Sequence, residues 1–145
     1  MGGGDSHDVS NDAVFKTLLR NAHTGYYRAV IAAPPCSTFS ISRFFNPNDG
    51  KPGPPPVRDR QNILGLAGLD PSRKRELKRA NELVLRTIAI CLACFSAGGD
   101  FLIENPADRG DRSVSHFMDE RHGPLWLHPA IIKLEQASSC ERISS

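Results

Sequence analysis

Residues 70–106 read DPSRKRELKRANELVLRTIAICLACFSAGGDFLIENP, and this segment predicts a long helix followed by a short strand. Asp70 is a favoured N-cap residue and Pro71 a favoured first-turn residue, so the helix is expected to begin here. Apolar side chains at helical spacing predict one buried stripe, formed by Leu77, Ala80, Val84, Ile88, Cys91 and Phe95. The pair Gly98 and Gly99 is expected to end the helix near residue 97, and residues 101–103 then form an apolar strand.

A second apolar run lies upstream. Residues 27–33, Tyr-Arg-Ala-Val-Ile-Ala-Ala, predict a strand that ends at Pro34. Strand, long helix and strand make a βαβ unit, whose crossover leaves both strands parallel in one sheet, usually buried on both faces. The sequence therefore predicts an α/β fold with a parallel βαβ core. It also places the residues that follow both strands at the carboxyl edge of the sheet, where ligands bind in such folds.

The remaining segments are arranged around this core as one domain. The expected segments are a disordered tail at 1–11, a helix at 12–22, a long Pro/Gly-rich loop at 34–70, short helices at 115–121 and 129–136, and a C-terminal tail at 137–145. A loop as long as 34–70 is usually functional or disordered. The domain itself is expected to span residues 12–136.

The composition is that of a small globular protein. The chain has 145 residues, of which 39% are hydrophobic and 23% charged, and its formal net charge is +2. Residues 51–90 hold nine Lys and Arg against four Asp and Glu, which suits either a phosphate-facing surface or a solvated helix face. No apolar segment is long enough to cross a bilayer, and no signal peptide is visible. We therefore expect no membrane association and an intracellular protein, nuclear or cytoplasmic and not secreted, with reduced thiols.

Cys36 follows the first predicted strand, directly after Pro34 and Pro35. A thiol held by two prolines at the carboxyl edge of a sheet is rigidly placed and partly exposed, as a nucleophile must be. The alternative is a small residue that fills a loop.

Glu104 and Asn105 follow the second predicted strand. A carboxyl group at the end of a buried strand is expected to be desolvated, which suits a proton donor near neutral pH, and Asn105 would orient it or contact a substrate. The alternative for Glu104 is a capping acid or an ion pair with Arg109 or Arg112. A cysteine and an acid without a histidine base between them fit an electrophile activated by protonation better than they fit a protease.

The two motifs together resemble those of a known enzyme family. Residues 33–40, APPCSTFS, resemble the Pro-Cys nucleophile motif of the cytosine-specific (C5) DNA methyltransferases, and residues 101–106, FLIENP, resemble their Glu-Asn motif in the same order. The resemblance implies a partial Rossmann-like S-adenosylmethionine-dependent methyltransferase fold. It implies that Cys36 attacks C6 of a flipped-out cytosine in DNA while Glu104 donates a proton or hydrogen bond at N3. The C5 carbon then takes a methyl group from S-adenosylmethionine.

The resemblance also implies which residues bind the substrate. Those expected to do so are Pro35, Ser37, Asn105, Arg58 and Arg60, with Arg43 and Lys51 of the same loop as further candidates for phosphate contacts. The family's glycine-rich cofactor loop and target-recognition region are not found here, so the residues that would bind S-adenosylmethionine are not identified. A second polypeptide that supplies the missing part of the fold is therefore one expected partner.

The alternative function is a catalytically inactive or truncated methyltransferase-like fragment that acts as a DNA-binding or interaction module. Its binding surface would include the basic residues of the long helix, namely Arg73, Lys74, Arg75, Lys78 and Arg79. No metal site is expected. Cys91 and Cys94 share a helix face without a second ligand pair at zinc-site spacing, so both are predicted to be core thiols.

Overall fold

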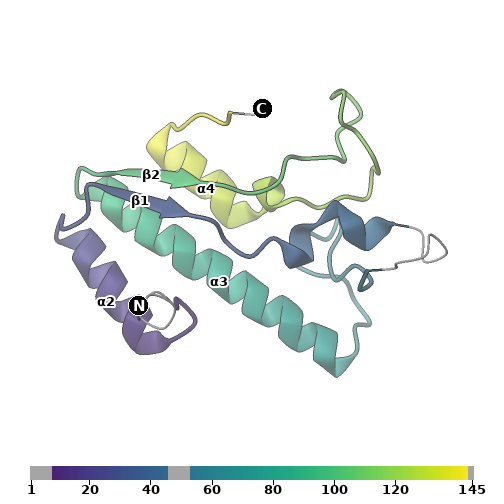
Figure 1. Ribbon diagram of the computed structural model, residues 1–145, viewed down its shortest axis with the longest axis horizontal. Coiled ribbons are helices and arrows are strands. Elements are labelled where there is room, and N and C mark those ends of the chain that lie inside the picture. The colour runs from purple at the N-terminus through teal and green to yellow at the C-terminus, as the bar shows by residue number, and fades with distance from the viewer. Residues whose placement is uncertain (1–7, 46–52, 144–145) are drawn as a thin grey trace.

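The computed structural model describes residues 8–45 and 53–143, in which helices and two strands surround one long helix (Figure 1). In chain order the elements are α2 (Asp12–His23), β1 (Ala29–Ala32), η1 (Ser37–Phe39), η2 (Ile41–Phe44), α3 (Pro71–Ser96), β2 (Asp100–Ile103), η3 (Leu125–Leu127) and α4 (Pro129–Ser138). Most of the expected N-terminal tail, the last two residues and Lys51 lie outside the described residues.

Helix α3 begins and ends close to the predicted residues. The Asp70 carboxylate accepts a hydrogen bond from the Arg73 backbone N–H at 2.9 Å, as an N-cap should. After Ser96, the Gly98 backbone adopts a φ of 94°, which glycine tolerates and other residues do not, and the chain turns toward β2. In the described ranges, 8–45 and 53–143, no helix has both the length and the apolarity needed to span a membrane.

The predicted apolar stripe of α3 forms the centre of the main core. Val84, Ile88 and Cys91 are buried, whereas Phe95 at the end of the stripe is 36% exposed. The other members of this core come from the segment after β1 and from the C-terminal part of the chain, and they are Phe39, Leu125, Ile131 and Leu134. The core therefore joins α3 to the Cys36 loop on one side and to α4 on the other.

Strands β1 and β2 pair in parallel, as the βαβ pattern predicts. Their register runs from Ala29 opposite Asp100 to Ala32 opposite Ile103. Figure 1 shows the two strands side by side above α3, both pointing toward the irregular half of the molecule. The carboxyl ends of both strands therefore meet at one edge, as expected.

The prediction that the sheet is buried on both faces is wrong for the described residues. Val30 and Phe101 pack against the main core on the α3 side. On the opposite face, Ile31 and Leu102 are opposite each other in the register and are 79% and 60% exposed. The sheet also has only two strands here, and β1 is shorter than the predicted strand at 27–33. Periodicity did not distinguish the open face because apolar residues occupy both sides of each strand.

Part of the expected N-terminal tail is packed rather than disordered. The Asn11 side chain caps α2 by accepting hydrogen bonds from the backbone of Ala13 and Val14. Val9 packs against the second core cluster between α2 and α3, and its carbonyl accepts a hydrogen bond from Arg86 at 2.9 Å. The ordered structure therefore begins before residue 12.

The C-terminal part contains one predicted helix instead of two. The helix predicted at 129–136 is present as α4 and continues to Ser138. The short helix predicted at 115–121 is absent, because aspartate side chains bind the local backbone there: Asp111 accepts from Ser113 N at 2.8 Å and Asp119 from Arg121 N at 2.9 Å. Such local bonds favour turns over helix.

Candidate active site

The two predicted motifs lie next to each other at the carboxyl edge of the sheet. The Glu104 backbone N–H donates to the Ala32 carbonyl at 2.9 Å, which continues the parallel ladder beyond β2. The Asn105 side chain then donates through Nδ2 to the Pro34 carbonyl at 3.0 Å. The segment that carries Glu104 is therefore tied directly to the loop that carries Cys36.

The loop around Cys36 is held by a nearby arginine and by side chains from distant segments. Arg43 Nε donates to the Ser37 carbonyl at 2.9 Å, and Arg58 Nη2 donates to the Thr38 hydroxyl at 3.1 Å. The next carbonyl, that of Phe39, is 2.8 Å from a ring nitrogen of His122. Together with the Asn105 bond before Cys36, these contacts fix the loop on both sides of the thiol, while Cys36 itself is exposed.

His122 is neutral in this arrangement. Its Nδ1 accepts a hydrogen bond from the Arg109 backbone N–H at 3.0 Å, so Nε2 carries the ring proton and donates it to the Phe39 carbonyl. Burial lowers the pKa of His122, which favours the same neutral form. Sequence spacing gave no indication that His122 holds the Cys36 loop, because its partners Phe39 and Arg109 are far from it in the chain.

Arg58 does not contact solvent, so the prediction that it binds phosphate is wrong for this conformation. It is 1% exposed, and its guanidinium lies 3.9 Å from the centre of the Phe39 ring. Besides Thr38, it donates to the Ile63 carbonyl and to the Asn81 side chain. Burial, with a smaller contribution from the Arg43 charge, lowers the pKa of Arg58 to about 10, so it stays charged at neutral pH. Arg58 therefore positions the Cys36 loop.

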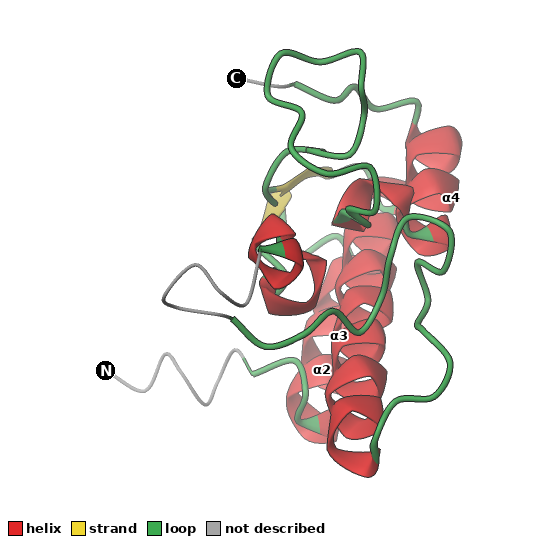
Figure 2. Ribbon diagram, turned by 90° about the vertical axis from the view of Figure 1, so that its right-hand side faces the viewer, coloured by secondary structure: helices red, strands yellow, loops and turns green. Residues whose placement is uncertain are grey.

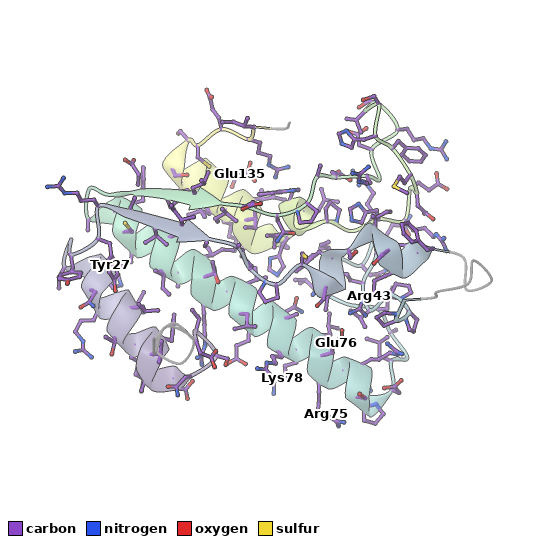
Figure 3. All side chains as sticks on the ribbon, in the orientation of Figure 1. Tyr27, Arg43, Arg75, Glu76, Lys78 and Glu135 are labelled. Carbon is purple, nitrogen blue, oxygen red and sulfur yellow. The ribbon has the colours of Figure 1, made fainter. Side chains whose placement is uncertain are left out.

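Arg60 and Arg43 are also engaged within the chain. Arg60 binds Asp108 through both terminal nitrogens, at 2.9 and 3.0 Å, and so joins the long loop to the segment after Glu104. Hydrogen bonds from Arg60 and from the Gly110 backbone outweigh burial and lower the pKa of Asp108. Arg43 is buried and forms an ion pair with Glu76 of α3, and Figure 3 shows the two side chains directed toward each other. The predicted phosphate contacts of Arg43 are therefore not available here, and Arg60 is only partly exposed.

The remaining predicted site residues form the surface around the thiol. Pro35, Ser37 and Glu104 are exposed, and Asn105 is partly buried. The expected desolvation of Glu104 is therefore wrong: the open face of the sheet leaves its carboxylate in contact with water. The structure thus brings Cys36, Glu104 and Asn105 to one edge and assigns the arginines to its support.

The cysteine pair of α3 lies in the core, as predicted. Cys91 and Cys94 are both completely buried, and burial raises the pKa of Cys91 to about 12. The Cys94 thiol is 3.4 Å from the Asp100 carbonyl, which it reaches as a weak donor. Across the described part of the chain, no group of three or more His, Cys, Asp or Glu side chains is placed to hold a metal ion.

Comparison of this chain with protein-family models, curated proteins and solved structures found no match.

Proposed function

We propose that this protein activates cytosine in DNA by covalent addition, as the base-binding part of a DNA (cytosine-5)-methyltransferase with a partial Rossmann-like fold. The observation that carries the proposal is the loop around Cys36. An exposed thiol lies in a loop that Arg43 of the same loop and side chains from three distant segments hold in place. Such preorganisation is what a nucleophile needs and what a loop filler does not.

The proposed reaction uses Cys36 and Glu104 in turn. The Cys36 thiolate forms a bond to C6 of a cytosine that has left the base stack. Glu104, whose exposed carboxylate can take up a proton from water, passes that proton to N3, so the ring is neutral after addition. The added ring is nucleophilic at C5 and exchanges its C5 hydrogen with the solvent. Loss of the N3 proton to Glu104 then expels the thiolate and restores cytosine. Asn105 keeps the Glu104 segment against the Pro34 carbonyl.

S-adenosylmethionine supplies the methyl group in the family that the sequence resembles, but the described residues do not fit this cofactor. The sheet of residues 8–45 and 53–143 has two strands, and the segments that follow them, 34–45 and 104–109, contain no glycine that would let a backbone approach the cofactor. No methyl-transfer step is therefore assigned to these residues. We propose that a second polypeptide supplies the missing part of the fold and covers this sheet, because Ile31 and Leu102 leave one face apolar and open.

Hydrogen exchange at C5 tests the addition without any cofactor. A duplex that contains cytosine is incubated with the protein in deuterium oxide, and its nucleosides are analysed by mass spectrometry. We expect deuterium at C5 of cytosine with the unaltered protein and with Cys140→Ser, which changes an exposed thiol elsewhere. Cys36→Ser should abolish the exchange, and Glu104→Gln should slow it at least tenfold. Exchange that survives Cys36→Ser, or no exchange in any sample, would contradict the proposal.

The basic part of α3 favours a DNA-binding module as the second candidate function. Lys74, Arg75, Lys78 and Arg79 are all exposed. Retention of DNA that weakens steeply with salt, without C5 exchange, would support this candidate over the first.

A further inference from the structure

A shallow groove lies along the first half of α3, away from Cys36. Its volume is about 630 Å³. It is lined by Leu66, Leu69, Lys74, Leu77, Lys78, Asn81, Glu82 and Leu85. Figure 2 shows the loop before α3 running beside that helix down to its first turn, which supplies the second wall. The α3 residues recur every three or four positions and so form one helix face.

The floor of the groove is apolar and partly exposed. Leu77 lies in the middle of the helix wall, and Leu66 and Leu69 face it from the loop. Leu85 at the far end is 55% exposed, and Leu64 next to the loop wall is 53% exposed. Leucines in contact with water at a concave surface contribute binding energy only when another apolar group covers them.

The wall is held in a fixed position. Asn81 donates through Nδ2 to the Leu64 carbonyl at 2.9 Å, and its oxygen accepts from Arg58 at 2.9 Å. At Gly65 the loop comes so close to α3 that an added Cβ would lie 2.2 Å from a methyl carbon of Leu77. The backbone there has a φ of 148°, which glycine alone adopts easily. The groove is therefore preformed and does not need to open on binding.

The rim of the groove is basic. Lys74 and Lys78 line it, and neither forms an ion pair within residues 8–45 and 53–143. Glu82 is the lining carboxylate; it lies 3.1 Å from Arg86, which also pairs with Asp12, so the two lysines leave the lining with a net positive charge. Figure 3 shows Lys78 and Arg75 on the side of α3 away from the sheet. A ligand with acidic groups beside the apolar floor complements this rim.

We propose that the groove binds an acidic amphipathic helix of another protein. The distance from Lys74 to Leu85 along α3 is about 16 Å, which matches about three turns of a partner helix. Leucines of that helix would cover the floor, and its carboxylates would lie beside Lys74 and Lys78, as in other helix-in-groove complexes. DNA phosphates would use the lysines but leave the leucine floor uncovered, so the combination favours a peptide. This proposal does not depend on the chemistry at Cys36.

The test uses a designed peptide as the probe. A fluorescent helical peptide of three to four turns carries leucines along one face and glutamates on both flanks, and its binding is followed by fluorescence anisotropy. We expect saturable binding in the micromolar range, weakened at least fivefold by Lys78→Glu and by Leu85→Gln. Lys133→Glu, at an exposed position of α4 outside the lining, serves as the matched charge-reversal control and should change the affinity less than twofold at about 0.15 M salt.

Three results would overturn the proposal. The first is no saturable binding up to about 1 mM peptide. The second is equal binding of a peptide whose leucines are replaced by serine, or equal binding to the Leu85→Gln protein. The third is that duplex DNA displaces the peptide, and that DNA binding is weakened by Lys78→Glu but not by Leu85→Gln. This result would assign the groove to nucleic acid. Circular dichroism of each variant verifies the fold, and because all three substituted side chains are exposed, each variant should remain folded.

Discussion

The Cys36 loop and the open face of the sheet are neighbours, yet they are stabilised in opposite ways. The loop has little regular structure, but Asn105, Arg43, Arg58 and His122 bind its backbone or its Thr38 hydroxyl. The sheet is regular, but Ile31 and Leu102 of one face are left in water. The difference indicates that several buried polar side chains of this chain hold the Cys36 loop, while a surface of the fold beside that loop remains uncovered.

Removal of the buried arginine should weaken the Cys36 loop most. Arg58→Ala should lower the free energy of unfolding by about 3–5 kcal/mol, because the groups that Arg58 binds lose their partner inside the protein. Arg79→Ala on the exposed side of α3 is the control and should change it by less than about 0.5 kcal/mol. Urea unfolding of both variants measures the difference. Equal stabilities would show that Arg58 does not support the loop.

The next largest effect is a loss of stability in acid. The pKa of His128 in the folded protein is lowered from 6.5 to about 4 by burial and by the Arg58 charge, while the unfolded chain keeps the ordinary value. The unfolded state therefore binds a proton between pH 6.5 and 4 that the folded state does not. Stability should be full above pH 6.5 and should fall by about 3 kcal/mol as the pH drops through that window.

A substitution isolates the contribution of this histidine. His128 caps α4 by accepting the Ala130 backbone N–H at 3.1 Å, and asparagine provides a similar acceptor without titrating in this range. His128→Asn should flatten the pH dependence measured by urea unfolding at each pH. His23→Asn at an exposed position should leave it unchanged. If the free energy of unfolding of His128→Asn still falls in acid, other groups cause the pH dependence, and His122 is the first to examine.

A smaller effect is expected at the link between the two motifs. Asn105→Asp replaces the donor to the Pro34 carbonyl by a group that only accepts, so we expect a loss of about 1–3 kcal/mol. The released loop should also change the rate at which iodoacetamide alkylates Cys36. Cys140 is exposed in the same chain and provides the internal reference rate. An unchanged ratio of the two rates would mean that Asn105 does not hold the loop.

The smallest expected difference compares the two faces of β1 directly. Val30 packs against the core and Ile31 is 79% exposed. Val30→Thr should cost about 1–2 kcal/mol, because a hydroxyl replaces a packed methyl group. Ile31→Thr should change stability by less than about 0.5 kcal/mol, because its side chain is already in water. Similar losses at both positions would mean that the open face is covered in solution.

The sequence predicted the regular elements better than the site. Capping residues, glycines and apolar spacing located α2, α3, β2 and α4 to within a few residues, because those features act locally. The same local patterns could not predict that Arg58 is buried or that Glu104 is exposed. Both depend on contacts between segments more than fifteen residues apart, such as Arg58 with Thr38. That the Cys36 and Glu104 segments meet at one edge of the sheet was predictable, because parallel strands end at one edge.

Covalent capture of Cys36 tests the central proposal most directly. An oligonucleotide duplex that contains 5-azacytosine offers a ring that, once attacked at C6, takes up a proton at position 5 and retains the sulfur bond. Intact-protein mass spectrometry then reports the adduct. We expect an adduct with the unaltered protein and with Cys140→Ser, and none with Cys36→Ser. An adduct that persists in Cys36→Ser, or its absence from the unaltered protein while the DNA is bound, would contradict the assignment of Cys36 as the nucleophile.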